Sequence, residues 1–172
     1  MHMKSRRHFL RSTSLAGMGL LLGGKKLAAG GSLQPESDPA SSREGDPVVI
    51  STWNFGEIAN GTAMEVLAGA GTAMDAVEAG VRVVEADPNN SSVGIGGTPD
   101  RDGRVTLDAC IMDHTHRCGS VAFLEDIMHP VSVARAVLER TPHVMLVGAG
   151  ARQFAVEQGF EPRNLLTEER KA

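Results

Sequence analysis

Two stretches of this chain place their apolar residues at the spacing of an amphipathic α-helix. They cover residues 57–68 and 72–86, and the segment Gly69-Ala70-Gly71 separates them. The apolar stripe of the second stretch consists of Ala73, Ala76, Val77, Gly80, Val81 and Val84. Its other side carries Asp75, Glu78, Arg82 and Glu85, which we expect to lie in solvent. The pattern predicts a pair of consecutive helices.

Shorter apolar runs predict strands. The run "VVIST" is typical of a short buried strand that ends at Trp53. Residues 104–113 and 119–124 are predicted to be two strands joined by a turn at 114–117. Beyond them we expect a helix that begins at Pro130, a buried strand "HVMLVG" and a last helix over 149–159. Because the strands cluster instead of alternating strictly with helices, the pattern favours a layered α+β fold over a doubly wound sheet.

The charge is divided unevenly along the chain, and this changes the picture of its first residues. Residues 1–31 hold six of the 17 basic residues and none of the 21 acidic ones. The remaining body is therefore strongly acidic, which argues against nucleic acid as a partner.

The basic start has the composition of an export signal. In "SRRHFLRS", Arg6 and Arg7 precede Phe9-Leu10, and a short apolar run follows. This arrangement predicts a twin-arginine signal peptide over residues 1–29, with export by the twin-arginine translocase to the periplasm or beyond. Residues 30–46 are rich in Gly, Ser and Pro, which predicts a flexible linker and leaves 47–172 as the folded part.

The run Gly94-Ile95-Gly96-Gly97 has the composition of a phosphate-binding loop, but its context does not fit. Such loops need a strand before the glycines and a helix directly after them. Here the turn sequence "TPDRDG" follows and leads into a strand. We expect these glycines to let backbone approach backbone or a ligand.

Four possible metal ligands, Cys110, His114, His116 and Cys118, fall within nine residues. One hairpin offers little support around such a site, so zinc is the weaker interpretation. A cross-strand disulfide, which an oxidising compartment would favour, is a second. The pattern favours two unpaired cysteines, with Cys110 as a small buried core residue.

The remaining polar candidates are predicted to be structural. Asp108 and Asp113 bracket an apolar segment and are expected to fix strand ends by accepting backbone N–H groups, while Asp100 and Asp102 belong to a solvated turn. His129 flanks a helix end and is expected to make local hydrogen bonds, as is His143. No Ser-His-Asp or Cys-His arrangement stands out in the sequence.

Several motifs nevertheless resemble, in order, those of one enzyme family. They are "STWNFG", "GTAMDAVEAGVRVVE", "SVGIGGTPDRDGRVTLDACIMD", "GSVA", "PVSVARAVLERTPHVMLVGAGARQFAVEQGF" and "NLLTEE". From about Pro47 to Glu169 the chain resembles the N-terminal, α-subunit half of the glycosylasparaginase branch of the asparaginase family of N-terminal nucleophile hydrolases. The plant-type asparaginase and isoaspartyl peptidase branch has different residues where this chain has Trp53, Phe55 and the Ser92-Val93-Gly94 segment.

The resemblance implies an αββα four-layer sandwich, of which this chain supplies only the N-terminal half. It implies a precursor cut autoproteolytically into two subunits, which assemble as a dimer of αβ units. A freed Thr at the start of the β-subunit attacks the side-chain amide of glycosylated asparagine, with its own α-amine as general base. Neither cofactor nor metal is implied.

The resemblance carries over few residues of this chain. Trp53 and Phe55 match residues that line the substrate pocket, and Ser92 matches a serine that supports the amine of the nucleophile. The chain has no His-Asp-Thr-Ile/Val-Gly segment, and none of its nine threonines stands in such a context. We therefore expect no catalytic residue in this chain and no hydrolysis by the chain alone. The alternatives are a plant-type asparaginase or isoaspartyl peptidase, and a non-catalytic remnant that serves as a binding module.

Overall fold

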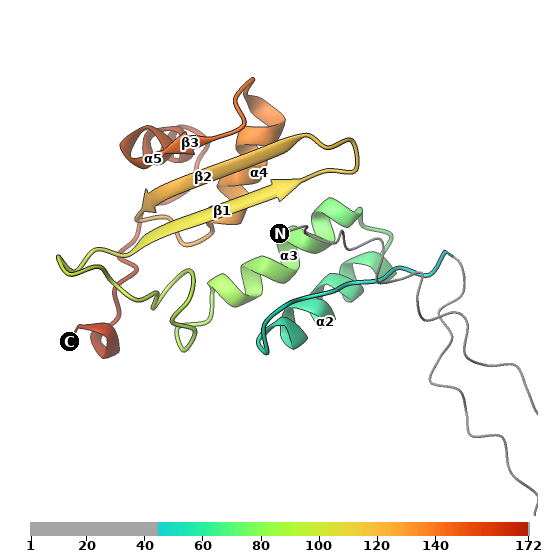
Figure 1. Cartoon of the computed structure of the whole chain (residues 1–172), viewed down its shortest axis with the longest axis horizontal. Coiled ribbons are helices and arrows are strands. Elements are labelled where there is room, and N and C mark those ends of the chain that lie inside the picture. Colours follow the sequence, from blue (N-terminus) through green and yellow to red (C-terminus); the bar gives the residue numbers. More distant parts are fainter. Residues whose placement is uncertain (1–44, 172) are drawn as a thin grey trace, which may run out of the picture. The chain divides into compact units, whose positions relative to one another are not determined.

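The structure, a computed structural model, describes residues 45–171. The predicted signal peptide and most of the predicted linker lie outside this range, so both stay predictions. The elements along the chain are α2 (Gly56–Ala68), α3 (Ala73–Glu85), β1 (Thr106–Met112), β2 (Cys118–Glu125), α4 (Pro130–Arg140), β3 (Leu146–Val147), α5 (Gly148–Glu157) and the short 3₁₀ helix η1 (Glu168–Arg170) (Figure 1).

The predicted helix pair is confirmed, because α2 and α3 lie side by side (Figure 1). Thr72 is the N-cap of α3, and its side chain and that of Asp75 each bond the other's backbone N–H in a capping box. The two helices approach so closely that a Cβ at Gly80 would lie 2.6 Å from the carbonyl oxygen of Ala59. Only a residue without a side chain fits at this crossing.

The three strands form one sheet in the order β1-β2-β3. β1 pairs with β2 antiparallel, as the hairpin prediction requires, and β2 pairs with β3 in parallel. The β1–β2 register shifts between Leu107 and Ala109, where the Asp108 carboxylate accepts the backbone N–H of Phe123 at 2.7 Å. The α+β class is confirmed, since helices and a small sheet occur together in the described residues.

One face of the sheet is covered by α4 and α5, and the main core lies there (Figure 1). α4 packs directly on β2, because a Cβ at Gly119 would lie 2.1 Å from the carbonyl oxygen of Ala134. The buried residues of this core are Ile111, Val121, Leu124, Ile127, Val131, Val133, Ala134, Val137, Leu138, Ala151 and Ala155.

The other face of β1 is open to solvent. Cys110 is exposed and Met112 is 62% exposed, whereas Ile111 between them is buried. The expectation that Cys110 is a buried core residue is therefore wrong. Strand residues alternate between faces, and Cys110 falls on the face that no helix of residues 45–171 covers.

Two predicted buried strands are also wrong in their extent or existence. Residues of "VVIST" form no strand, and Ile50 is 86% exposed. In "HVMLVG" only Leu146–Val147 is a strand, and Val144 is 66% exposed. A strand needs a neighbour to satisfy its backbone groups; within residues 45–171 "VVIST" has none, and in "HVMLVG" only Leu146 and Val147 have one, in β2.

The helical stripe of α3 was predicted correctly at Ala76, Gly80 and Val84, which are buried. Val77 is 48% exposed, because the described residues do not cover that side of α3. Glu85 was expected in solvent but is only 1% exposed. It is buried because its carboxylate bonds the first turn of α4, as described below.

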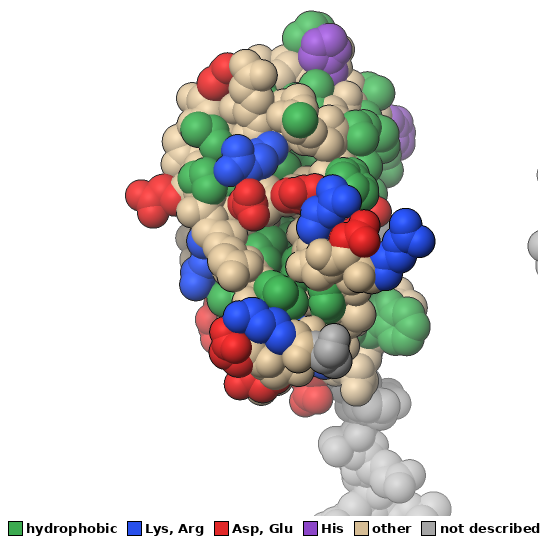
Figure 2. All heavy atoms as spheres, turned by 90° about the vertical axis from the view of Figure 1, so that its left-hand side faces the viewer, with side chains coloured by type: hydrophobic (Ala, Val, Ile, Leu, Met, Phe, Trp, Pro, Cys, Tyr) green, Lys and Arg blue, Asp and Glu red, His purple; other side chains and the backbone are tan. Residues whose placement is uncertain are grey.

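A network of charged groups joins α3 to α4. Nη1 of Arg135 donates to Asp75 at 2.7 Å and to Glu78 at 2.8 Å, and Nε of the same residue donates to Glu139. Elsewhere on the surface, acidic and basic side chains also alternate, as the face in Figure 2 shows. No helix within residues 45–171 has the length and apolar character to cross a membrane.

We expect this network to make stability depend on acid. Hydrogen bonds from the Thr72 hydroxyl and from Arg135 lower the pKa of Asp75 from 3.8 to about 2. Because the folded pKa lies below the unfolded one, the stabilisation is complete above about pH 4 and is lost as pH falls towards about 2. Urea midpoints measured across this range should fall less for Asp75→Asn than for the wild type. Equal falls would contradict the assignment.

Candidate functional site

The first candidate site element is the aromatic loop, residues 51–55, which leads into α2. Its end is closed by the N–H of Gly56, which donates to the carbonyl of Trp53 at 2.8 Å. The Ser51 hydroxyl bonds the Asn60 side chain at 2.5 Å, which ties the start of the loop to α2. A Cβ at Gly56 would lie 2.2 Å from Cβ of Ser51, so the two ends of the loop lie too close together for a side chain at position 56.

This loop presents two aromatic rings together. The rings of Trp53 and Phe55 stack with centroids 6.4 Å apart and planes at 19°. Trp53 is 70% exposed although it is the only tryptophan of the chain. A stacked pair with one exposed ring and one half-buried ring offers an apolar surface to a ligand or to another part of a protein. The structure thus brings the two predicted pocket residues together.

The second element is the glycine loop, residues 91–98, which contains Ser92. Its ends meet where the N–H of Thr98 donates to the carbonyl of Ser91 at 2.9 Å. The Ser92 N–H donates to the Asn90 side chain at 2.8 Å, and the residue is exposed. Among the described residues, no hydrogen bond or ring contact joins Ser92 to the aromatic pair.

The glycines of this loop let backbone approach backbone, as predicted. Gly94 and Gly96 have φ of +66° and +81°, the left-handed region. A Cβ at Gly94 would lie 1.8 Å from the carbonyl oxygen of Glu85, and one at Gly96 would lie 2.4 Å from that of Pro88. The loop also joins the C-terminal segment, since the N–H of Gly96 donates to the carbonyl of Leu165 at 2.9 Å.

Three aspartates have lowered pKa values and act as anions in turns and caps. The pKa of Asp113 is lowered most, chiefly by the hydroxyl of Thr115, and the backbone N–H of Arg104 lowers that of Asp100. Asp113 also accepts the N–H of Arg117 and so holds the β1–β2 turn, as expected. Carboxyls held as anions in this way are poor proton donors at neutral pH.

The Cys/His segment is spread over the hairpin. Cys110 pairs with Ser120, whereas Cys118 pairs with Met112, so the cysteines are diagonal neighbours. Diagonal Cα atoms lie about 7–8 Å apart, beyond the reach of an unstrained disulfide. Both thiols are free, and no three His, Cys, Asp or Glu side chains within residues 45–171 are grouped to hold a metal ion.

Several threonine hydroxyls of the described residues donate to backbone carbonyl groups. Thr62 donates to Ile58, Thr98 to Ser91 and Thr141 to Val137, while the hydroxyl of Thr167 is buried without a partner. In the intact chain each is bonded to a preceding residue, so it would have the free α-amine that a threonine nucleophile uses as its base only after cleavage of that peptide bond.

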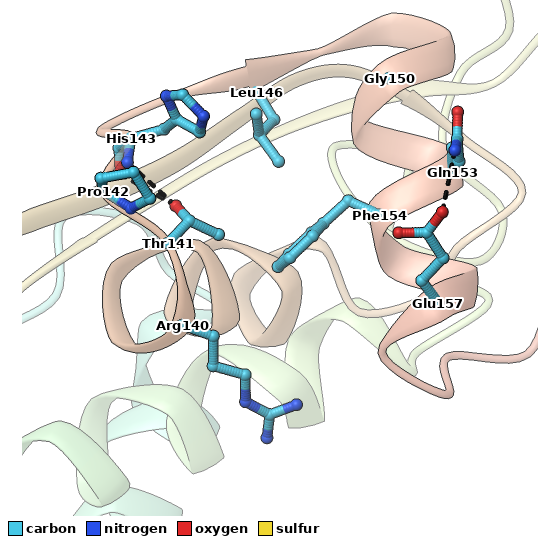
Figure 3. Close-up of a pocket in the computed structure, with 9 residues that line it drawn as sticks. All are labelled: Arg140, Thr141, Pro142, His143, Leu146, Gly150, Gln153, Phe154 and Glu157. Carbon is cyan, nitrogen blue, oxygen red and sulfur yellow. Dashed lines mark hydrogen bonds between the residues drawn. The ribbon is translucent and has the colours of Figure 1, made fainter.

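Two hollows among residues 45–171 lie away from these loops. The one in Figure 3 measures about 450 Å³ and lies between the end of α4, β3 and α5, with Phe154 and Leu146 on its apolar side. His143 is at its rim, and its backbone N–H bonds the hydroxyl of Thr141. A second hollow of about 310 Å³ lies beside the start of α3. Neither contains Trp53, Phe55 or Ser92.

Sequence reasoning missed Glu85 as a residue that matters to the site. Helical periodicity placed it on the polar side, and a carboxylate at a helix end gives no sign of burial. Its position at the end of α3, just before the segment that leads to the glycine loop, indicates a link to that loop but not its burial.

The sequence is similar to those of known proteins over most of its length. The model of the asparaginase family matches residues 38–172. Among curated proteins, the chain is 53% identical over 165 residues to the N(4)-(beta-N-acetylglucosaminyl)-L-asparaginase of Elizabethkingia miricola. The aligned residues make up 96% of this chain and 47% of that protein.

Two further relatives extend the comparison. The protein of the same name from Rattus norvegicus is 43% identical over 73% of this chain and 36% of its own length. The isoaspartyl peptidase of Salmonella typhimurium is 48% identical over 52% of this chain and 28% of its own length. The chain thus spans less than half the length of each of these three proteins.

Proposed function

The chain belongs to the asparaginase family, and from this we propose that it is the N-terminal portion of an amidohydrolase that cleaves the side-chain amide of glycosylated asparagine. The observation that carries the proposal is the 53% identity to a protein named N(4)-(beta-N-acetylglucosaminyl)-L-asparaginase across 96% of this chain. The order of its motifs along the chain supports the same assignment.

In this proposal the reaction needs a second portion of the protein. A threonine at the start of that portion attacks the amide carbon, and its own α-amine accepts the hydroxyl proton. The amine returns the proton to the leaving aminosugar, and water then hydrolyses the aspartyl ester. The products are aspartate and an aminosugar, which loses ammonia. Without that portion, this chain hydrolyses nothing.

The described residues take supporting roles. The stacked rings of Trp53 and Phe55 line the substrate pocket, and the exposed ring of Trp53 leaves the pair accessible to a ligand. The hydroxyl of Ser92 supports the threonine amine by a hydrogen bond, which keeps that amine oriented as a base.

The partner we propose is the β-subunit of the same precursor, and the fold is an αββα sandwich. The open face of β1 and the unpaired "VVIST" segment, with Val48 and Ile50 68% and 86% exposed, are the surfaces we expect it to cover. Two such αβ units form the dimer. The twin-arginine segment supports export of the folded precursor to the periplasm or beyond.

A second function is favoured by one observation. The relative from Salmonella typhimurium is named isoaspartyl peptidase and is 48% identical over 90 residues. This supports a β-aspartyl peptide, or free asparagine, as an alternative substrate with the same nucleophile chemistry.

The test begins with the native protein, whose gene is read beyond Ala172 and whose intact mass is measured after export. We expect two subunits, and hydrolysis of glycosylated asparagine in preference to a β-aspartyl dipeptide and to free asparagine. The emission of Trp53 should be blue-shifted relative to this chain alone, because the partner covers it. A single subunit without activity on all three substrates would overturn the proposal and favour a binding module. Preference for the dipeptide would favour the alternative.

A further inference from the structure

Glu85 is a buried carboxylate that no step of the proposed reaction uses. It is 1% exposed. One carboxylate oxygen accepts the backbone N–H of Val131 at 3.1 Å, and the other lies 3.1 Å from Nδ1 of His129. A buried carboxylate is costly unless it is paired, so these contacts are needed to keep it in place.

These contacts make Glu85 the cap of α4. The N-cap residue His129 makes no side-chain cap bond, and Pro130 at the first helical position has no N–H to donate. The N–H of Val131 is thus the first that needs an acceptor, and Glu85 supplies it from α3. A carboxylate is favoured at this end of a helix because the helix dipole is positive there.

The backbone of the same residue supports the glycine loop. Its carbonyl accepts the N–H of Ile95 at 2.9 Å. Gly94 lies directly on this carbonyl, where no Cβ fits. One residue therefore joins the first turn of α4 by its side chain and the glycine loop by its main chain.

The first turn of α4 is a firm anchor. Val131 and Val133 are 2% and 0% exposed and belong to the main core. The charged groups at this turn come from α3, since Arg82 donates to the Ser132 hydroxyl of α4 at 2.8 Å and that hydroxyl donates to Glu78 at 2.5 Å. Any shift of Glu85 relative to α4 would be passed to residues 94 and 95.

We propose that Glu85 is a positioning residue for Ser92. Its carboxylate fixes the base of the glycine loop against the first turn of α4, so that the Ser92 hydroxyl is held at one place beside the threonine amine. The claim about catalysis rests on the proposed function, whereas the claim about the loop does not.

The test compares Glu85→Ala with Glu85→Gln in the native two-subunit enzyme. Glu85→Ala should lower kcat by about tenfold to a hundredfold with little change in KM, because small displacements of a supporting group act on the reaction step. It should also shift the acidic limb of the pH profile of kcat, which reports the amine base. Glu85→Gln should retain kcat within about threefold, because its amide can accept from Val131 and donate to Nδ1 of His129.

The matched control is Val137→Ala. Val137 lies in α4, the helix that Glu85 caps, is 0% exposed, and belongs to the main core, which includes no residue of the glycine loop. It should lower Tm as Glu85→Ala does but keep kcat and the pH profile. If Glu85→Ala also keeps both, its role is only structural and the proposal fails.

Amide hydrogen exchange separates this proposal from the proposed function. Exchange at Ile95 and Gly96 should be faster in Glu85→Ala than in Val137→Ala at equal Tm. If the wild type hydrolyses none of the three substrates, the proposed function fails, and exchange alone decides whether Glu85 positions the loop. Unchanged exchange at both amides would overturn the positioning claim whatever the activity.

Discussion

Replacement of Gly119 by alanine should be the most damaging single change in the sheet, with a loss of about 3 kcal/mol in the free energy of unfolding. The added Cβ would lie 2.1 Å from the carbonyl oxygen of Ala134 and 2.6 Å from the backbone nitrogen of Leu138. Both atoms belong to the backbone of α4, which cannot move by a change of rotamer. Urea unfolding followed by far-UV circular dichroism measures the loss.

Gly61→Ala is the matched control, because Gly61 lies inside α2 with nothing within 4 Å of the added Cβ. Alanine is the better helix former, so this variant should gain about 0.5–1 kcal/mol. If Gly119→Ala unfolds within about 0.5 kcal/mol of the wild type, α4 does not rest on β2 as described.

The helices were predictable because their signals are local. The stripe of α3 repeats at helical spacing, and Thr72 with Asp75 forms a capping box that can be recognised from spacing alone. The β1–β2 hairpin was predictable for the same reason, since a turn and two alternating segments are neighbours in sequence. The residues that determine these elements therefore lie within the elements themselves.

The predictions of buried strands were wrong for segments whose burial depends on residues far away in sequence. Ile50 and Val144 look like core residues by composition, yet both are exposed, because a strand is buried only where another surface covers it. The prediction that Cys110 is buried was wrong for a related reason. Alternation placed it on one of two faces, and only the packing of α4 decides which face is covered.

Burial of Glu85 could not be predicted, because the reason for it lies 46 positions away at Val131. The candidate site shows the same division. The sequence places Trp53 and Phe55 in one short loop and permits left-handed backbone at Gly94 and Gly96, but the ring stacking and the positive φ values are seen only in the structure. The contact of the glycine loop with the Glu85 carbonyl is a tertiary contact and is seen only in the structure.

Gly94→Ala should be the most damaging change in the candidate site. Gly94 has φ of +66°, which costs an alanine about 1–2 kcal/mol, and the added Cβ would also lie 1.8 Å from the carbonyl oxygen of Glu85. The steric term should bring the total loss to about 3 kcal/mol or more. Because the loop must move to relieve the contact, the bond from Ile95 to Glu85 should open, and amide exchange at Ile95 measures this.

Gly103→Ala is the control that separates the cost of the steric contact from the cost of the left-handed backbone. Gly103 has φ of +80°, so it pays the same left-handed strain, but nothing lies within 4 Å of its added Cβ. We expect a loss of about 1 kcal/mol there and unchanged exchange at Ile95. If the two variants lose equal stability, strain alone explains both. In that case the close contact with Glu85 does not hold the glycine loop, and Ser92 is held by the loop's own turn bonds at Asn90 and Thr98.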